Sequence, residues 1–339
     1  MKDGHFQVSK DVLTLYYNNF PASDLLTGKG LVIGGSHNIY ALNEEIQYGD
    51  LSAVLMQNAP FWTNWIRTPE LSILLMDEWE SKIEKLAEVT VKENVTSISG
   101  VPTWSMVLFR RILELTGKQT IAEVWPELEL FMHGGVSFVP YREQFQQLIG
   151  KTINYLEMYN ASEGFFAAQD KPGDEGMLLF ADHGIFYEFI PVAEYFNENP
   201  TRLTISQVEV GVNYALVISS NAGLWAYSIG DTVKFTSVKP YKVIVSGRIK
   251  HFISAFGEHV IGEEVEYALL SVANQEGLEI TEFTVAPQVN PRVGELPYHE
   301  WFVEFEHRPD DMQAFARRID DHLRSKNSYY DDLISGGIL

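Results

Sequence analysis

The sequence contains no cysteine among its 339 residues. Without a thiol the protein cannot form disulfides, use a cysteine nucleophile or build a thiolate zinc site, and this favours a reducing compartment. Basic residues are also scarce, because Lys and Arg number 25 against 46 Asp and Glu, and the formal net charge is −21. This surplus of negative charge disfavours broad contact with nucleic acid or an anionic membrane. Any anionic ligand therefore requires a local basic group or a metal ion.

Long hydrophobic runs are absent as well. Nowhere do eighteen apolar residues follow one another, and the segment from Met1 to Tyr17 has no basic stretch followed by an apolar core. We therefore expect a cytoplasmic protein that neither crosses a membrane nor binds nucleic acid.

Several common catalytic motifs are missing. The sequence has no Gly-x-Ser-x-Gly, no His-Glu-x-x-His and no Gly-x-x-x-x-Gly-Lys-Ser/Thr, because Gly117-Lys118 is followed by Gln119. The nine histidines are scattered at spacings that fit no familiar metal site. A nucleophile elbow, a zincin site and a P-loop are thus excluded.

The composition that is present is typical of a soluble globular protein, with 45% hydrophobic, 13% aromatic and 21% charged residues. The length favours two or three domains. In the first half of the chain strands alternate with helices, which indicates an α/β layer. The predicted strands are 31–33, 95–98, 128–132 and 153–158, and the predicted helices begin near Ser9 and cover 78–91, 103–115 and 141–149.

After Gly164 the pattern changes to short β-rich runs separated by Gly, Asn and Pro, which predicts an antiparallel sheet or barrel. The predicted strands there are 177–180, 186–190, 203–210, 214–219, 224–229 and 241–245. Beyond Gly247 the order helix, strand, strand, helix indicates a small α+β unit. We expect a domain boundary over 247–253.

Two short segments at the ends of predicted strands carry candidate chemistry, because open α/β sheets place their ligands there. In 133–136 (His-Gly-Gly-Val) the paired glycines let the backbone approach a ligand and leave amides free to donate. In 159–164 (Tyr-Asn-Ala-Ser-Glu-Gly) the side chains suit a magnesium nucleotide. We expect Tyr159 to stack on a base, Ser162 to donate to an α-phosphate oxygen and Glu163 to ligate Mg²⁺. The plain alternatives are a tight glycine connection and a polar strand end.

Two later segments add a carboxylate and a basic group. In 227–232 a glycine turn presents Asp231, whose two oxygens can accept from both hydroxyls of a ribose. In 247–250 (Gly-Arg-Ile-Lys) Arg248 can reach a ribose or phosphate at the predicted domain boundary. The alternatives are an ordinary turn and a basic linker.

Taken in order, the patterns Tyr-x-x-Ser-Glu-Gly, Tyr-x-x-Gly-Asp and Gly-Arg-x-Lys resemble the fifth, seventh and eighth core motifs of the adenylate-forming superfamily of acyl-CoA synthetases, adenylation domains and luciferases. A closer resemblance is carried by 99–104 (Ser-Gly-Val-Pro-Thr-Trp), 133–138 (His-Gly-Gly-Val-Ser-Phe) and 160–166 (Asn-Ala-Ser-Glu-Gly-Phe-Phe). These segments look like the bacterial branch of the auxin-responsive-promoter (Gretchen Hagen) family of acyl-acid amido synthetases. The similarity runs through nearly the whole chain.

The resemblance implies the adenylate-forming α/β fold, with a large α/β plus β-barrel-like domain and a small α+β C-terminal domain. It implies that 1–246 is the large nucleotide- and acid-binding domain without its N-terminal part, that 247–253 is a hinge, and that 254–339 is the small C-terminal domain, which rotates about the hinge. It implies ATP, Mg²⁺, a small carboxylic acid and an amino acid as reactants, with an acyl-adenylate between them. Catalytic roles fall on Ser162 and Glu163, the latter as metal ligand. Cofactor-binding roles fall on His133, Gly134, Gly135, Tyr159, Asn160, Ser162, Asp231, Arg248 and Lys250. The acid pocket falls near Trp104, Phe165 and Phe166, for which an aromatic core is the alternative.

Members of that family also carry a Ser/Thr/Gly-rich phosphate loop ahead of the first helix and a lysine in a C-terminal tail. Neither feature has a counterpart here, and Lys326 is the last lysine. We therefore expect a chain truncated at both ends with weak or absent adenylation. An acid:CoA ligase of the same superfamily and a non-catalytic nucleotide-binding or interaction protein remain alternatives, and nothing selects the acid or the amino acid.

Overall fold

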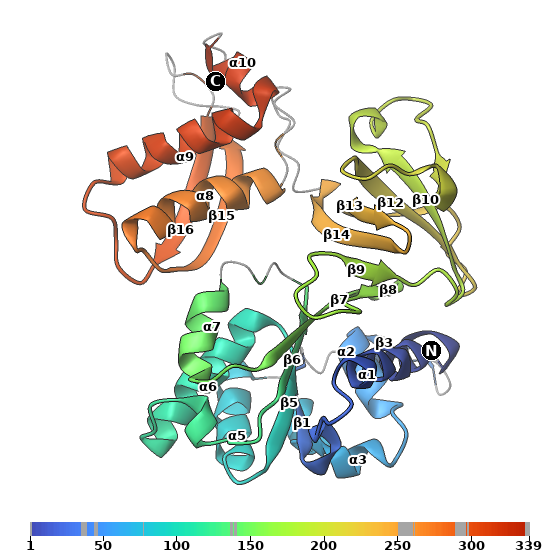
Figure 1. The fold of residues 1–339 in the computed structure, drawn as a ribbon, viewed down its shortest axis with the longest axis vertical. Helices are drawn as coiled ribbons and strands as arrows, with labels where there is room; N and C mark the ends of the chain where they lie inside the picture. The colour runs from blue at the N-terminus through green and yellow to red at the C-terminus, as the bar shows by residue number, and fades with distance from the viewer. Residues whose placement is uncertain are drawn as a thin grey trace. The chain divides into compact units, whose positions relative to one another are not determined.

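The computed structural model describes residues 2–34, 39–43, 47–76, 78–135, 138, 141–249, 260, 262–288, 296 and 298–335. The chain forms two compact units, Met1–His183 and Gly184–Leu339. Figure 1 shows the first unit in blue to green and the second in green to red.

The sheet of the first unit runs in the order β9-β8-β7-β6-β5-β1-β4. Strands β4, β1, β5, β6 and β7 are parallel neighbours, whereas β8 and β9 join antiparallel. The carboxyl ends of the parallel strands therefore share one edge. The strands are β1 Lys29–Val32, β4 Arg67–Thr68, β5 Val95–Ser99, β6 Leu130–Gly134, β7 Asn154–Ala161, β8 Gly164–Ala168 and β9 Met177–Leu179, with a separate hairpin of β2 Ile39–Ala41 and β3 Gln47–Gly49.

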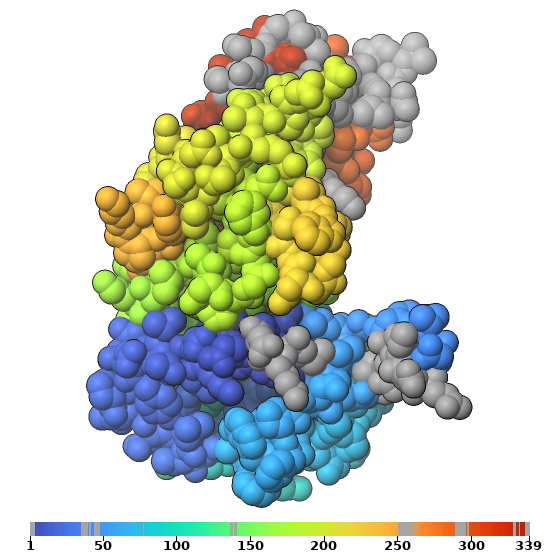
Figure 2. All heavy atoms as spheres, turned by 90° about the vertical axis from the view of Figure 1, so that its right-hand side faces the viewer, coloured from blue at the N-terminus to red at the C-terminus, as the bar shows by residue number. Residues whose placement is uncertain are grey.

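Helices cover both faces of this sheet (Figure 1). On one face Phe109 and Phe145 pack with the strand residue Phe131. On the other face Val12 packs with Leu130, so successive residues of β6 enter different cores. The N-terminal residues, dark blue in Figure 2, form outer surface over this second core. The helices are α1 Gln7–Asn19, α2 Leu51–Gln57, α3 Thr63–Ile66, α4 Leu71–Leu74, α5 Trp79–Thr90, α6 Pro102–Thr116 and α7 Arg142–Ile149.

Local signals explain where the long helices begin and end. The Glu78 side chain accepts from the backbone N–H groups of Glu80 and Ser81 at the start of α5. Helix α6 has Pro102 in its first turn and ends at Gly117, whose φ is +67°. The limits predicted for these helices from the sequence agree with the structure to within one residue.

The second unit contains an antiparallel sheet in the order β11-β10-β12-β13-β14. The rings of Phe189, Tyr214 and Phe235 meet in its core, with centroids 5.1 to 6.1 Å apart. The strands are β10 Ile185–Pro191, β11 Leu203–Thr204, β12 Asn213–Ser220, β13 Tyr227–Val238 and β14 Tyr241–Arg248. The strand expected over 203–210 is wrong beyond Thr204, because Thr204 and Gln207 cap a short 3-10 helix, Ile205–Gln207.

The C-terminal part of this unit is the expected helix, strand, strand, helix arrangement, followed by one more helix. Leu269 of α8 and Phe315 of α9 belong to one core cluster, against which Val303 of β16 packs. The elements are α8 Gly262–Glu276, β15 Ile280–Gln288, β16 Tyr298–Phe305, α9 Met312–Lys326 and α10 Ser328–Ser335. Among the described residues of the whole chain, no helix is both long and apolar enough to span a bilayer.

Candidate functional site

The loops after β5 and β6 meet at the carboxyl edge of the parallel sheet in the first unit. Gly135 has a φ of +84°, and a Cβ there would lie 3.9 Å from Cγ2 of Val101. Gly134 pairs with Met158 of β7, and a Cβ there would lie 2.4 Å from the Met158 carbonyl oxygen and 3.6 Å from Oδ1 of Asn160. Glycine is therefore needed at both positions. The structure brings this glycine pair beside Asn160.

His133 lies directly before the glycine pair and is only 3% exposed. Its ring stacks on Phe131 at 5.4 Å and lies 4.4 Å from Phe138. Burial, together with the positive charge of Arg142, lowers the pKa of His133 to about 4. The ring is therefore neutral at pH 7, and its Nδ1 has no hydrogen-bond partner among the described residues. A contribution of His133 to nucleotide binding stays a prediction.

Segment 159–164 forms the tip of a β-hairpin. The strand expected to end at residue 158 continues to Ala161, because Asn160 pairs with Phe165 of β8. Ser162 and Glu163 are the two turn residues. Neither of their side chains makes a hydrogen bond or ion pair within the described parts of the chain. The two side chains singled out for phosphate and metal thus lie in a turn, where Ser162 is exposed and Glu163 is partly buried.

A magnesium ion is implied by the nucleotide hypothesis, and the oxygen donors of this turn are compatible with one. The described residues contain no group of three or more His, Asp or Glu side chains that could hold a metal by themselves. Mg²⁺ is usually held by one or two carboxylates together with phosphates and water. The Glu163 carboxylate suits that single protein contribution, and its role stays a prediction.

The residues proposed to contact base and acid lie in packed surroundings. Tyr159 is 7% exposed, and its ring centroid lies 4.9 Å from that of Phe166. Phe165 is buried in the core cluster that contains α1 residues. Trp104, near the start of α6, lies 5.4 Å from the ring of Trp79 and packs against the other core. The aromatic-core alternative therefore accounts for Phe165 and Phe166, and the ligand-binding roles stay predictions.

In the second unit Asp231 lies in a β-bulge of β13. The expectation of a turn after a strand ending at residue 229 is wrong, because β13 continues through this point to Val238. Between two successive β12–β13 pairs, residues 229–231 of β13 face one residue of β12. Gly230 in this bulge has a φ of +86°. The bulge leaves Asp231 only 5% exposed.

Arg248 is the antiparallel partner of Asp231 in the β13–β14 ladder. Its Nε donates to Oδ1 of Asp231 at 2.7 Å, and its side chain is 55% exposed. Beside this pair the hydroxyl of Ser246 donates to Oδ1 of Asn213 at 2.5 Å and lies 2.9 Å from the hydroxyl of Thr232. The structure thus brings the third and fourth sequence segments together. Lys250 lies outside the described residues.

One sequence-based hypothesis is that four side chains share one cleft: Ser162 and Glu163 of the first unit, and Asp231 and Arg248 of the second. This shared cleft stays a prediction.

Lys82 is a residue that motif reasoning missed. It lies on α5, is 1% exposed, and its Nζ donates to the carbonyl oxygen of Gly34 at 3.1 Å, just after β1. Lysine is rarely buried to this degree unless it is paired, so Lys82 helps to fix the segment after β1 at the carboxyl edge. The only signal in the sequence is its position between Trp79 and Ile83 on the apolar face of the predicted helix.

Comparison with known protein families matches three consecutive domains of one family. The GH3 family N-terminal domain matches residues 22–153, the central domain matches 178–248 and the C-terminal domain matches 263–338. The three matches follow one another in order and together cover more than half of the chain. The chain belongs to the GH3 family. This agrees with the resemblance to the Gretchen Hagen family read from the sequence, whereas its bacterial branch and the truncation stay predictions.

Curated relatives of this GH3 chain are plant amido synthetases. The indole-3-acetic acid-amido synthetase GH3.3 of Arabidopsis thaliana is 25% identical over 265 residues, which cover 73% of this chain and 44% of that protein. The jasmonoyl-L-amino acid synthetase GH3.5 of Oryza sativa subsp. japonica is 25% identical over 171 residues, or 44% of this chain and 29% of that protein. The chain thus spans less than half the length of either relative.

Solved structures support the fold of the GH3 chain. An acyl acid amido synthetase, AtGH3.15 in complex with 2,4-DB, matches with a TM-score of 0.75 and 13% identity over 97% of this chain and 68% of that one. A 2-hydroxyisobutyryl-CoA ligase in a postadenylation state matches with a TM-score of 0.58 and 13% identity over 88% of this chain and 60% of that one. The chain therefore has the mixed α/β fold of GH3 and adenylate-forming enzymes. The domain division at 247–253 stays a prediction.

Proposed function

We propose that this GH3 chain carries the site at which an acyl-acid amido synthetase activates a carboxylic acid with ATP and transfers it to an amino acid. A carboxylate oxygen of the acid attacks the α-phosphorus of ATP, the bond to the β-phosphate breaks, and pyrophosphate leaves. The amine of the amino acid then attacks the acyl carbon, forms the amide, loses a proton and releases AMP.

The observation that carries this proposal is the run of three GH3 domain matches in order along the chain. It is supported by relatives that are named as amido synthetases for indole-3-acetic acid and jasmonate. Which acid and which amino acid this chain uses is left open by 25% identity.

The roles proposed for the chain's own residues are binding, positioning and charge neutralisation at phosphorus. The backbone of Gly134 and Gly135 approaches the nucleotide, and Tyr159 contacts its adenine. Ser162 donates to the α-phosphate. Asp231, held by Arg248 at 2.7 Å, accepts from the ribose hydroxyls. When bound, Mg²⁺ beside Glu163 would neutralise negative charge on the phosphates.

An acid:CoA ligase is the second candidate, because the fold also matches a CoA ligase with a TM-score of 0.58. Both reactions share the adenylate and differ in the acceptor. Incubating the protein with ATP, Mg²⁺ and a panel of carboxylic acids, with either amino acids or coenzyme A, separates them by the mass of the product. Amides support the first proposal, and thioesters in their place support the second.

Nucleotide binding is tested by thermal unfolding with ATP, AMP and Mg²⁺. A ligand at 100 times its Kd stabilises the native state by about 2.7 kcal/mol, so we expect a clear rise in Tm. Asp231→Ala should abolish most of the rise, whereas Asp310→Ala, at an exposed position in the second unit, should keep it. If wild-type protein shows no rise with either nucleotide, adenylation by this chain is ruled out; a rise without any product supports a nucleotide-binding protein instead.

A further inference from the structure

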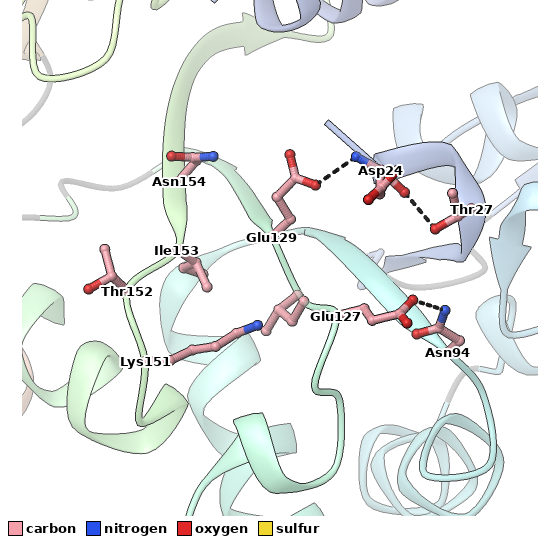
Figure 3. Close-up of a pocket in the computed structure, with 10 residues that line it drawn as sticks. Asp24, Thr27, Asn94, Glu127, Glu129, Lys151, Thr152, Ile153 and Asn154 are labelled. Carbon is pink, nitrogen blue, oxygen red and sulfur yellow. Dashed lines mark hydrogen bonds between the residues drawn. The ribbon is translucent and has the colours of Figure 1, made fainter. Parts of the chain in front are cut away.

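A polar cavity of about 650 Å³ opens at the amino edge of the parallel sheet in the first unit. Its lining comes from the segments that lead into β1, β5, β6 and β7 (Figure 3). The first-unit residues of the proposed catalytic site follow the opposite ends of β5, β6 and β7. Because β7 has eight residues, the two edges lie about 23 Å apart. The cavity therefore lies apart from the residues that the first unit contributes to the proposed nucleotide site.

Three carboxylates and one lysine give the cavity its charge. Glu129 is occupied, because its oxygens accept from the hydroxyl of Tyr16 at 2.5 Å and the backbone N–H of Asp24 at 3.2 Å. Glu127 accepts from Asn94 through Oε2 only, at 2.5 Å. The Asp24 carboxylate and Glu127 Oε1 make no bond to the described residues. The carboxylate oxygens of Asp24 and the Oε1 atom of Glu127 can therefore accept hydrogen bonds from a ligand in the cavity.

Lys151 supplies the opposite charge. Its Nζ donates to the carbonyl oxygen of Pro126 at 2.6 Å, which leaves two further N–H donors of the ammonium group. Partial burial lowers the pKa of Lys151, while Glu129 and Glu127 act to raise it, so the amine and the carboxylates lie within electrostatic reach of one another. In Figure 3 the lysine side chain extends from the β7 side toward the residues that precede β6.

This arrangement selects against ligands of a single charge. An anion on Lys151 would face three carboxylates, and a simple cation beside Asp24 and Glu127 would face the lysine. We propose that the cavity is a second ligand site for a small amino zwitterion, with its ammonium group toward Asp24 and Glu127 and its carboxylate toward Lys151. The polar lining suits such a ligand, and the open volume of about 650 Å³ admits a small amino acid together with bridging water.

The probe is L-serine, compared with its methyl ester, which keeps only the ammonium group, and with N-acetylserine, which keeps only the carboxylate. Binding to the full chain is measured by isothermal titration calorimetry. We expect serine to bind at least tenfold more tightly than either derivative. Lys151→Met and Glu127→Gln should each weaken serine binding at least tenfold, and Lys118→Met, an exposed lysine elsewhere in the unit, should not.

Asp231→Ala, which removes the proposed ribose contact, should leave serine binding unchanged, so a failure of nucleotide binding and a failure of serine binding are distinguishable. Lys151→Met and Glu127→Gln locate the serine at the cavity rather than at the acceptor part of the proposed catalytic site. Serine binding that is unchanged in both Lys151→Met and Glu127→Gln would place it elsewhere and overturn the proposal. So would the absence of binding to wild-type protein, or a methyl ester that binds as tightly as serine. Circular dichroism of Lys151→Met and Glu127→Gln shows whether either variant has unfolded. If Lys151→Met has unfolded, Lys151→Arg, which keeps the positive charge, takes its place and should bind serine as wild-type protein does.

Discussion

The buried side chain of His133 contributes to the pH dependence of this protein's stability. In the folded state its pKa is lowered to about 4, whereas an unfolded histidine titrates near 6.5. Between these values the unfolded chain binds a proton that the folded chain does not. The contribution of His133 to stability is therefore fully present above pH 6.5 and is lost as the pH falls toward 4.

We predict that unfolding free energy falls by about 2 to 3 kcal/mol more in wild-type protein than in His133→Leu between pH 7 and pH 4.5. Urea denaturation at the two pH values measures this difference. The neighbouring Glu157 has a pKa that burial raises, so it acts in the opposite direction, but it is present in both proteins and cancels. His307→Leu, at an exposed position, is the control and should behave as wild type. Equal pH dependence of wild type and His133→Leu would contradict the prediction.

At the scale of the elements, the close approach of β6 and β7 depends on one glycine. A Cβ on Gly134 would lie 2.4 Å from the backbone carbonyl oxygen of Met158, and real Cβ atoms do not approach a backbone atom so closely. The two strands would have to separate, because a main-chain oxygen cannot rotate away as a side chain can. The end of β6 and the position of Asn160 would shift together.

Gly134→Ala should therefore lower the unfolding free energy by about 1 to 3 kcal/mol, the usual range for overpacking a well-packed site. Gly262→Ala is the matched control, because a Cβ at Gly262 meets only Cα of Gly247, at 3.8 Å, and its φ lies outside the left-handed region. Chemical denaturation of both variants measures the difference. A Gly134→Ala protein as stable as Gly262→Ala would show that the strands have room to move apart.

At the scale of the whole molecule, the net charge of −21 opposes compaction through self-repulsion. Salt screens such repulsion, since the Debye length falls from about 30 Å at 0.01 M to about 10 Å at 0.1 M. We predict that NaCl between 10 and 200 mM raises Tm by about 1 to 2 °C, a shift that corresponds to about 1 kcal/mol in a chain of 339 residues. KCl should raise Tm by the same amount as NaCl at each concentration. Sucrose at matched osmolality, which carries no charge, should not reproduce this dependence of Tm on concentration. A Tm that falls with added NaCl would contradict this.

Much of the fold could be predicted because it rests on local patterns. The helix over 79–90 follows from the spacing of Trp79, Ile83 and Leu86 and the cap at Glu78, all of which lie within a few turns of one another. The strand β8 was missed, because all of its residues are buried and it shows no alternation. The segments of the candidate site could be singled out because glycines and polar residues interrupt apolar strands there, and their roles stay predictions.

The sequence by itself determined the alternating order of strands and helices, the family and the segments in which the candidate residues lie, because periodicity, caps and short motifs are properties of neighbouring residues. Only the tertiary structure decided that segment 159–164 is a hairpin tip, that Asp231 lies in a bulge beside Arg248, and that Lys82 is buried. Each of these depends on the register and packing of strands distant along the chain. Such pairings are selected by the free energy of the whole core, which a pattern of neighbouring residues does not determine.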